Sequence, residues 1–168
     1  MNGTSVNQSQ EEAEEALAQL PDLPLSPHPN YVTHSGLAQL HERLAAAEAR
    51  RPELDSAGPA KAAEAAEFAR DMRWLQARLS SAIVVESDRQ SADRVAFGAS
   101  VEAVDQHEHR HRYRIVGEDQ ADPEHGLVSW VSPLARALEG ARVGDNVAWK
   151  RPAGDLEIEV LSIDYAAS

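Results

Sequence analysis

The sequence predicts an α+β protein: an antiparallel α-helical hairpin, or short coiled coil, followed by a small antiparallel β domain with one short helix. Two observations predict this class. Between positions 31 and 86, apolar residues recur every three or four positions, which is the period of a helix packed along one side. From Ile83 onward the pattern changes to alternation with β-branched residues, which is typical of half-buried strands. We therefore divide the chain into a tail (1–30), a helical hairpin (31–86) and a β domain (87–168).

The N-terminal segment, residues 1–30, lacks the signals of a folded element. It holds five acidic residues and no Lys or Arg, and its last ten residues, PDLPLSPHPN, contain four prolines. Proline removes a backbone donor and blocks helix formation, so we expect a largely disordered tail. Within it, EEAEEALAQL (11–20) has the composition of a transient helix.

Residues 31–86 carry two helical seams joined by a turn. Thr33 or Ser35 is placed to cap the first helix. The first seam consists of Leu37, Leu40, Leu44, Ala47 and Leu54, and the second of Phe68, Met72, Leu75, Leu79 and Ala82. Between them, DSAGPAKAAEAAEF (55–68) begins with turn-forming residues. Two seams on either side of a short turn predict an antiparallel hairpin.

Five candidate strands follow, separated by turn signals. They are VAFGASVEAV (95–104), HRYRIVG (111–117), LVSWV (127–131), NVAWK (146–150) and LEIEVLSI (156–163). Between the third and fourth, SPLARALEG (132–140) predicts a short helix with Ser132 as N-cap, Pro133 in the first position and Gly140 at its end. The result is a twisted sheet with one helix packed against it.

Composition excludes several classes of protein. A net charge of −12 argues against a general DNA or RNA binder, which would carry a basic surface. The absence of cysteine excludes disulfide frameworks, thiolate nucleophiles and cysteine-based zinc sites. The sequence contains no run of 18 apolar residues, so we expect no transmembrane helix. Its N-terminus has no positive charge ahead of an apolar stretch, so we expect no signal peptide. We therefore expect a cytoplasmic protein with no membrane association.

The C-terminal half resembles a known family over long stretches. YRIVGEDQADPEHGLVSWVSPLARALEGARVGD (113–145) is similar to the C-terminal signature of the bacterial Gre transcription elongation factors, GreA and GreB. PAGDLEIEVLSIDY (152–165) resembles their last hairpin. YVTHSGLAQLHERL (31–44) and RRPE (50–53) match the family's first helix more loosely. The resemblance covers about residues 31–165 and leaves the tail unmatched.

The resemblance implies a fold and a partner. It implies an FKBP-like C-terminal domain without prolyl isomerase activity, which docks on RNA polymerase core at the rim of the secondary channel. The hairpin of Gre factors reaches down that channel, and acidic residues at its tip help hold Mg²⁺ at the polymerase active site, where the polymerase cleaves backtracked RNA. Such a chain would be a monomeric regulator, not an enzyme, with no cofactor of its own, and would contact nucleic acid only within the transcription complex.

The hairpin tip departs from the family pattern. The Gre tip reads approximately Gly-Asp-Leu-Lys-Glu-Asn, whereas the best match here is GPAKAA (58–63), which puts Pro59 and Ala62 at the two acidic positions. An alternative alignment of EAAEF (64–68) recovers one acid, Glu64. From Leu37 to Leu54 the helix rises only about 25–30 Å, and the Gre hairpin is several turns longer. The layout is similar to that of the regulator of nucleoside diphosphate kinase, Rnk.

These features give three open interpretations. The first is a Gre-like polymerase-binding regulator without cleavage stimulation and without a catalytic residue. The second is an active cleavage factor in which Glu53, Asp55 or Glu64 positions the metal. The third is a free-standing FKBP-like binder. For the first, the resemblance places the docking surface around an acidic loop and a Ser-Pro corner: Asp119, Asp122, Val131, Ser132, Pro133 and Leu134.

A histidine run, HEHRH (107–111), has two interpretations. On a strand, His107, His109 and His111 would share one face, a spacing seen in metal sites. The alternative is a solvated turn between the first two strands of the β domain, with no metal bound. We favour the turn.

Overall fold

The computed structural model describes residues 20–86 and 90–165, and the predicted disorder of residues 1–19 lies outside them. Leu20–Asn30 contains no helix or strand. The described residues form two compact units. The first combines the end of the tail, up to Pro27, with Leu40–Ser81, and the second combines His28–Gln39 with the chain from Ala82 onward. The residues just before the hairpin and its first helical turns thus group with the β domain.

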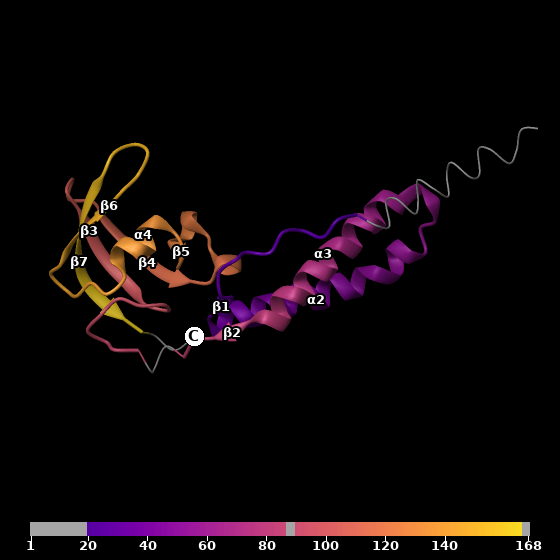
Figure 1. Cartoon of the computed structure of the whole chain (residues 1–168), viewed down its shortest axis with the longest axis horizontal. Helices are drawn as coiled ribbons and strands as arrows, with labels where there is room; N and C mark the ends of the chain where they lie inside the picture. Colours follow the sequence, from indigo (N-terminus) through magenta and orange to yellow (C-terminus); the bar gives the residue numbers. More distant parts are fainter. Residues whose placement is uncertain (1–19, 87–89, 166–168) are drawn as a thin grey trace, which may run out of the picture. The chain divides into compact units, whose positions relative to one another are not determined.

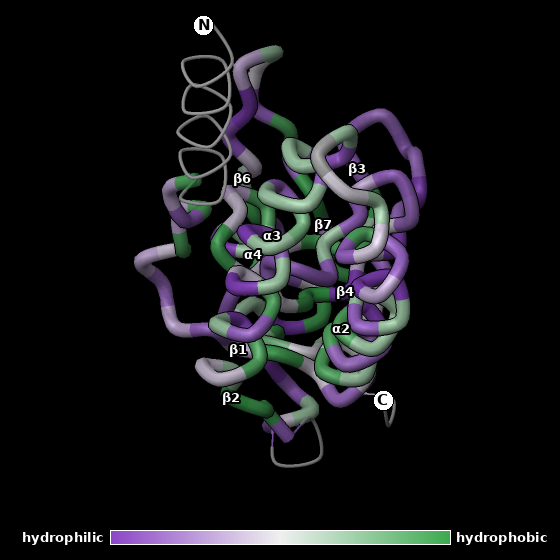
Figure 2. The backbone as a smooth tube through the Cα atoms, turned by 90° about the vertical axis from the view of Figure 1, so that its right-hand side faces the viewer, coloured by the Kyte–Doolittle hydropathy of each residue, from purple (hydrophilic) through white to green (hydrophobic). Residues whose placement is uncertain are grey.

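The first unit is built from the two helices of the predicted hairpin. Helix α2 spans His34–Asp55 and continues through Pro52, and helix α3 spans Ala62–Ser81 (Figure 1). Between them lie a turn and the short 3₁₀ helix η1, Pro59–Lys61. Both predicted seams contribute to the interior, since Leu40, Leu54, Met72 and Leu75 are buried. Figure 2 shows hydrophilic and hydrophobic residues mixed along α2, as expected for helices that bury only one side.

Thr33 begins α2 and also fixes it to the β domain. Its hydroxyl oxygen accepts the backbone N–H of Gly36 at 2.9 Å, which confirms the N-cap prediction. The same hydroxyl donates to Oε1 of Gln120 at 2.6 Å, and Nε2 of Gln120 donates to Ser35 at 3.0 Å. A Cβ atom at Gly36 would lie 2.7 Å from that amide oxygen, so a larger residue there would require the Gln120 side chain to move.

A two-stranded parallel sheet that the sequence did not predict closes the base of the hairpin. Strand β1, Tyr31–Val32, pairs with β2, Ile83–Val84, so the chain enters and leaves the hairpin at adjacent positions. The backbone of Gly117 lies so close to the carbonyl of Tyr31 that a side chain there would collide with it. These contacts anchor β1 within the second unit.

The β domain is a five-stranded sheet in the order β5-β4-β3-β7-β6. Its strands are β3 (Ser100–Asp105), β4 (Arg110–Val116), β5 (Leu127–Ser129), β6 (Asn146–Trp149) and β7 (Leu156–Asp164). Only β4 and β5 pair in parallel. This confirms the predicted mostly antiparallel sheet. Strand β3 begins five residues later than predicted, because Val95 exchanges hydrogen bonds with Gly140 and Ala141 after the short helix instead of with a strand.

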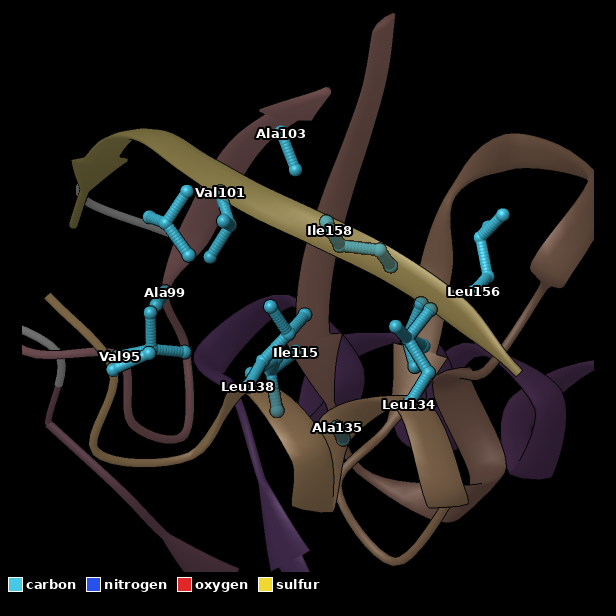
Figure 3. Close-up of a cluster of buried hydrophobic side chains, with 13 residues drawn as sticks. Val95, Ala99, Val101, Ala103, Ile115, Leu134, Ala135, Leu138, Leu156 and Ile158 are labelled. Atoms are coloured by element: carbon cyan, nitrogen blue, oxygen red, sulfur yellow. The ribbon is translucent and has the colours of Figure 1, made fainter. Parts of the chain in front are cut away.

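The core of the domain lies between the sheet and helix α4, Pro133–Leu138 (Figure 3). Alternate residues of β7, namely Leu156, Ile158 and Val160, are buried, as the period of two predicts. Leu134 and Leu138 of α4 face them in the same cluster. Across the described ranges, no helix is long and apolar enough to cross a membrane.

Candidate functional site

The hairpin tip is a short turn without a cluster of carboxylates. Gly58 adopts a left-handed conformation (φ 65°) between the end of α2 and η1. Ser56 donates its hydroxyl to the carbonyl of Glu53 at 3.0 Å and tightens the end of α2. Beneath the tip, Leu54 and Ala66 are buried and hold the two helices together.

The three acidic residues near the tip do not converge. Glu53 and Asp55 are exposed at the end of α2. Glu64, in the first turn of α3, accepts a hydrogen bond from Nη2 of Arg50 at 3.0 Å, and the pair links the two helices. Among the described residues, no group of three or more His, Asp or Glu side chains is arranged to hold a metal ion.

The acidic loop and the Ser-Pro corner flank the same short strand. Asp119 lies in the 3₁₀ helix η3, Glu118–Gln120, and Asp122 comes directly before a second one, η4, Pro123–His125. Strand β5 follows and then leads into the corner at Ser132. A strand of three residues spans only about 10 Å, so the two stretches leave opposite ends of one short element.

The residues of the acidic loop are held by local bonds. The backbone N–H of Asp122 donates to the carbonyl of Leu127 at 2.8 Å, and the N–H of Leu127 returns a bond of 2.9 Å. The carboxylate of Asp122 lies 2.7 Å from Nδ1 of His125. The backbone of the loop is thereby fixed to the start of β5, while Glu124 remains exposed.

The Ser-Pro corner divides into surface and core residues. Ser132 caps α4, because its hydroxyl accepts the backbone N–H of Ala135 at 3.2 Å, and Pro133 occupies the first position, as predicted. Pro133 is exposed, and Val131 is partly exposed. Leu134, by contrast, is only 5% exposed and packs in the domain core. The surface available to a partner here therefore consists of Val131, Ser132 and Pro133.

The histidine run forms a turn around a buried carboxylate. Strand β4 begins at Arg110, so His107 lies in the turn and does not share a strand face with His111. Asp105 at the end of β3 accepts the backbone N–H groups of His107 and His109 at 2.8 and 3.0 Å, and its Oδ2 lies 2.9 Å from Nε2 of His111. The His111 bond first, and then these N–H groups, hold the pKa of Asp105 well below its usual range.

Gln120 is a buried side chain with a structural role that the sequence pattern does not indicate. Although it lies within an acidic loop, it is only 9% exposed and connects η3 to the start of α2. Gln120 lies between acidic residues, and no periodic pattern of apolar residues around it indicates that its side chain is buried. Only the proximity of residues more than 80 positions apart reveals its role.

Comparisons with known proteins assign the chain to a family. The family model for the C-terminal domain of the transcription elongation factors GreA and GreB matches residues 90–165. The chain is 42% identical over 100 residues to the transcription elongation factor GreB of Neisseria meningitidis, a match over 59% of this chain and 61% of that protein. It is 31% identical over 154 residues to GreA of Desulfovibrio desulfuricans, covering 82% of this chain and 94% of the relative. The chain belongs to the GreA/GreB family.

The extent of the matches differs among relatives. For several GreA and GreB relatives, the alignment covers 52–59% of this chain and 54–61% of the relative's own length. Among solved structures, the chain is similar to the GreA factor homolog 1 (Gfh1) of Thermus thermophilus, with 24% identity over 82% of this chain and 99% of that one, at a TM-score of 0.40. A GreA/GreB factor from Nitrosomonas europaea gives 20% identity over 80% of this chain and 98% of that one, at a TM-score of 0.41.

Proposed function

We propose that this GreA/GreB family member binds RNA polymerase through its β domain at the secondary-channel entrance and regulates elongation without stimulating transcript cleavage. This would place the protein in the cytoplasm with the polymerase, as a monomeric regulator without a cofactor. The proposal rests on two features of the chain together: a plain hairpin tip, and a β domain whose sequence matches the family model over residues 90–165. The hairpin and the β domain thus differ in how many of the residues expected from the family they retain.

The chemistry of the tip supports the absence of cleavage stimulation. A hard cation such as Mg²⁺ requires oxygen ligands at about 2 Å, so the coordinating carboxylates must be free and placed together. Pro59 and Ala62 occupy the positions where the resemblance expects acids. The nearby Glu64 is already paired with Arg50.

The length of the hairpin supports the same conclusion. Helices α2 and α3 contain 22 and 20 residues. At a rise of about 1.5 Å per residue, the arms are about 33 and 30 Å long. An arm several turns shorter than that of a cleavage factor would stop short of the polymerase active site, and metal coordination does not tolerate a gap of that size.

The proposed docking surface combines Asp119 and Asp122 with Val131, Ser132 and Pro133. Both stretches flank β5, and the bonds of Asp122 to Leu127 and of Ser132 to Ala135 fix their backbones. A fixed acidic loop beside an exposed proline suits a basic and apolar partner surface. Leu134 would act indirectly, by holding α4 on the core.

A cleavage assay on stalled transcription complexes, run beside a polymerase pull-down, tests the proposal. We expect the protein to be retained by RNA polymerase core and to leave the RNA length unchanged with Mg²⁺ present. Magnesium-dependent shortening that disappears in Glu64→Ala and persists in the neighbouring control Glu67→Ala would establish a cleavage factor instead. No retention at low or moderate salt would point to a free-standing binder.

A charge reversal tests the docking surface. Asp122→Lys should lower polymerase retention by roughly tenfold or more, because like charges placed in an interface cost several kcal/mol. Asp155→Lys is the matched control, since Asp155 is exposed in the turn between β6 and β7. Equal loss in both variants would show that overall charge, and not this loop, determines binding.

A further inference from the structure

A small cavity in the β domain has aromatic walls and an aliphatic floor. Its volume is about 120 Å³, and the side chains of Tyr31, Phe97 and Trp130 form much of its wall. Ile115 and Ala135, which also border it, belong to the buried cluster between the sheet and α4 (Figure 3). The cavity therefore leads from the surface of the domain to its core.

The aromatic walls are held by contacts between rings. The ring centre of Tyr31 lies 4.9 Å from that of Trp130 and 6.0 Å from that of Phe97. All three residues are partly exposed. Nε1 of Trp130 is buried and has no hydrogen-bond acceptor among the described residues. Because no hydrogen bond fixes the indole, this ring can tilt to admit an occupant.

The size and lining of the cavity determine what fits. An apolar cavity of roughly 150 Å³ holds one benzene molecule, so the smaller volume here suits a single branched aliphatic side chain and not the ring of a Tyr or Trp. Water in a cavity needs several polar partners. The side chains at the floor, Ile115 and Ala135, provide none. An aliphatic side chain is therefore a better occupant than water.

One carboxylate stands at the rim of this cavity. Glu139, the residue that follows α4, borders it and is exposed to solvent. Within the described part of the chain, Glu139 forms no ion pair. A free carboxylate beside an apolar cavity favours a partner in which a basic residue stands next to the aliphatic one.

The cavity adjoins the proposed docking surface. Trp130 directly precedes Val131, and Ser132 caps the helix to which Ala135 belongs. A partner seated on Val131, Ser132 and Pro133 would thus reach the mouth of the cavity with its neighbouring residues. The two surfaces also suit the same kind of partner, one that is both basic and apolar.

We propose that this cavity anchors the partner of the β domain: one Leu, Ile or Val side chain of the partner enters it, and an adjacent Lys or Arg pairs with Glu139. The proposal rests on the proposed function, since it takes RNA polymerase core as the partner. It adds the feature that the docking segment of the polymerase must carry, an exposed aliphatic residue beside a basic one.

Filling the cavity tests the anchor on the polymerase. Ala96 borders the cavity, so the larger side chain of Ala96→Leu takes up part of its volume. We expect this variant to lose retention on RNA polymerase core by roughly tenfold or more, because the partner's side chain can no longer be buried there. Ala148→Leu is the matched control, since Ala148 is exposed on β6 and does not border the cavity. It should be retained like the parent chain.

A peptide titration tests the cavity without the polymerase. The probe is the peptide acetyl-Gly-Leu-Lys-Gly-amide, its control has Ala in place of Leu, and the indole N–H signals in a ¹⁵N correlation spectrum report binding. We expect the Leu peptide to shift the signal of Trp130, with those of Trp74 and Trp149 unchanged. The Ala peptide, and the Leu peptide added to Ala96→Leu, should produce no shift. Glu139→Gln should weaken the Leu peptide several-fold, whereas Glu157→Gln, at an exposed position of β7, should not.

The outcomes separate this proposal from the proposed function. Equal retention of Ala96→Leu and the parent chain would overturn the anchor and leave polymerase binding intact. No retention of the parent chain, with a Trp130 shift still produced by the Leu peptide, would overturn the polymerase as partner and support the cavity as a binding site. Equal shifts with both peptides, or none with either, would overturn the cavity as a site for an aliphatic side chain.

Discussion

The helical hairpin and the β domain bury apolar surface in very different ways. The β domain encloses a continuous cluster that includes Val101, Leu138 and Ile158, each fully buried between the sheet and α4. The hairpin buries single side chains along its two seams, such as Leu54 in α2 and Met72 in α3, and leaves a groove open beside them. The match to the family model also falls on the β domain, at residues 90–165. We infer that the β domain contributes most of the stability and carries the sequence features of the family, whereas the hairpin tolerates more change in sequence.

Core truncations provide the largest test of this comparison. Ile158→Ala should destabilise the β domain by about 3–5 kcal/mol, because it leaves a cavity in a close-packed core. Met72→Ala should cost about 2 kcal/mol in the hairpin, since Met72 borders a groove into which solvent and neighbours can move. Amide hydrogen exchange in each unit measures both effects separately. Equal costs would remove the proposed difference between the two regions.

Gln120 tests whether the start of α2 depends on the β domain. Gln120→Ala leaves the hydroxyls of Thr33 and Ser35 without this partner, so we expect a loss of about 1–3 kcal/mol in urea unfolding. The control Gln76→Ala lies at an exposed position of α3 and should change stability by less than about 0.5 kcal/mol. A neutral Gln120→Ala would show that Thr33 caps α2 without help.

The pH dependence of Asp105 sharpens the description of the β3–β4 turn. Because folding lowers the pKa of this carboxyl, its contribution to stability is fully present above its ordinary pKa and is lost as pH falls below that value. Asp105→Asn should therefore lower the melting temperature at neutral pH, and the difference from the parent chain should shrink below about pH 4. A difference that stays constant down to pH 2 would contradict this assignment.

The smallest effect is expected at the hairpin tip. Arg50→Ala should change hairpin stability by less than about 1 kcal/mol, because exposed ion pairs are screened by water and salt. Glu64→Ala should give the same result, and the double variant should match either single one within error. A strongly destabilised single variant would show that the Arg50–Glu64 pair is structurally important.

The sequence predicted the elements whose residues repeat along the chain. Alternation in LEIEVLSI and seams in both helices were sufficient, because burial on one face imposes that period directly. Ser132 and Pro133 gave the start of α4 because capping depends on local backbone donors. These features depend only on residues that are near in sequence.

Features that depend on distant partners could not be predicted. The pairing of Tyr31 with Ile83 joins two strands of two residues each, which are too short to show a period. Val95 bonds with the loop after α4, and this removes it from the predicted strand. In the candidate docking site, the acidic loop and the Ser-Pro corner were identified by resemblance, while the burial of Leu134 became clear only from the packed core.

The pairing of β1 with β2 makes the hairpin an insertion whose two ends lie on neighbouring strands. Because Val32 leads into α2 and Ile83 follows α3 on the neighbouring strand, an antiparallel pair of arms of another length can be inserted there without altering the pairing of β1 with β2. Evolution or a protein engineer could lengthen both arms by equal numbers of heptads and change the reach of the molecule in steps of about 10 Å. Diversification within such a family would then require only changes in arm length and tip chemistry, on a constant base.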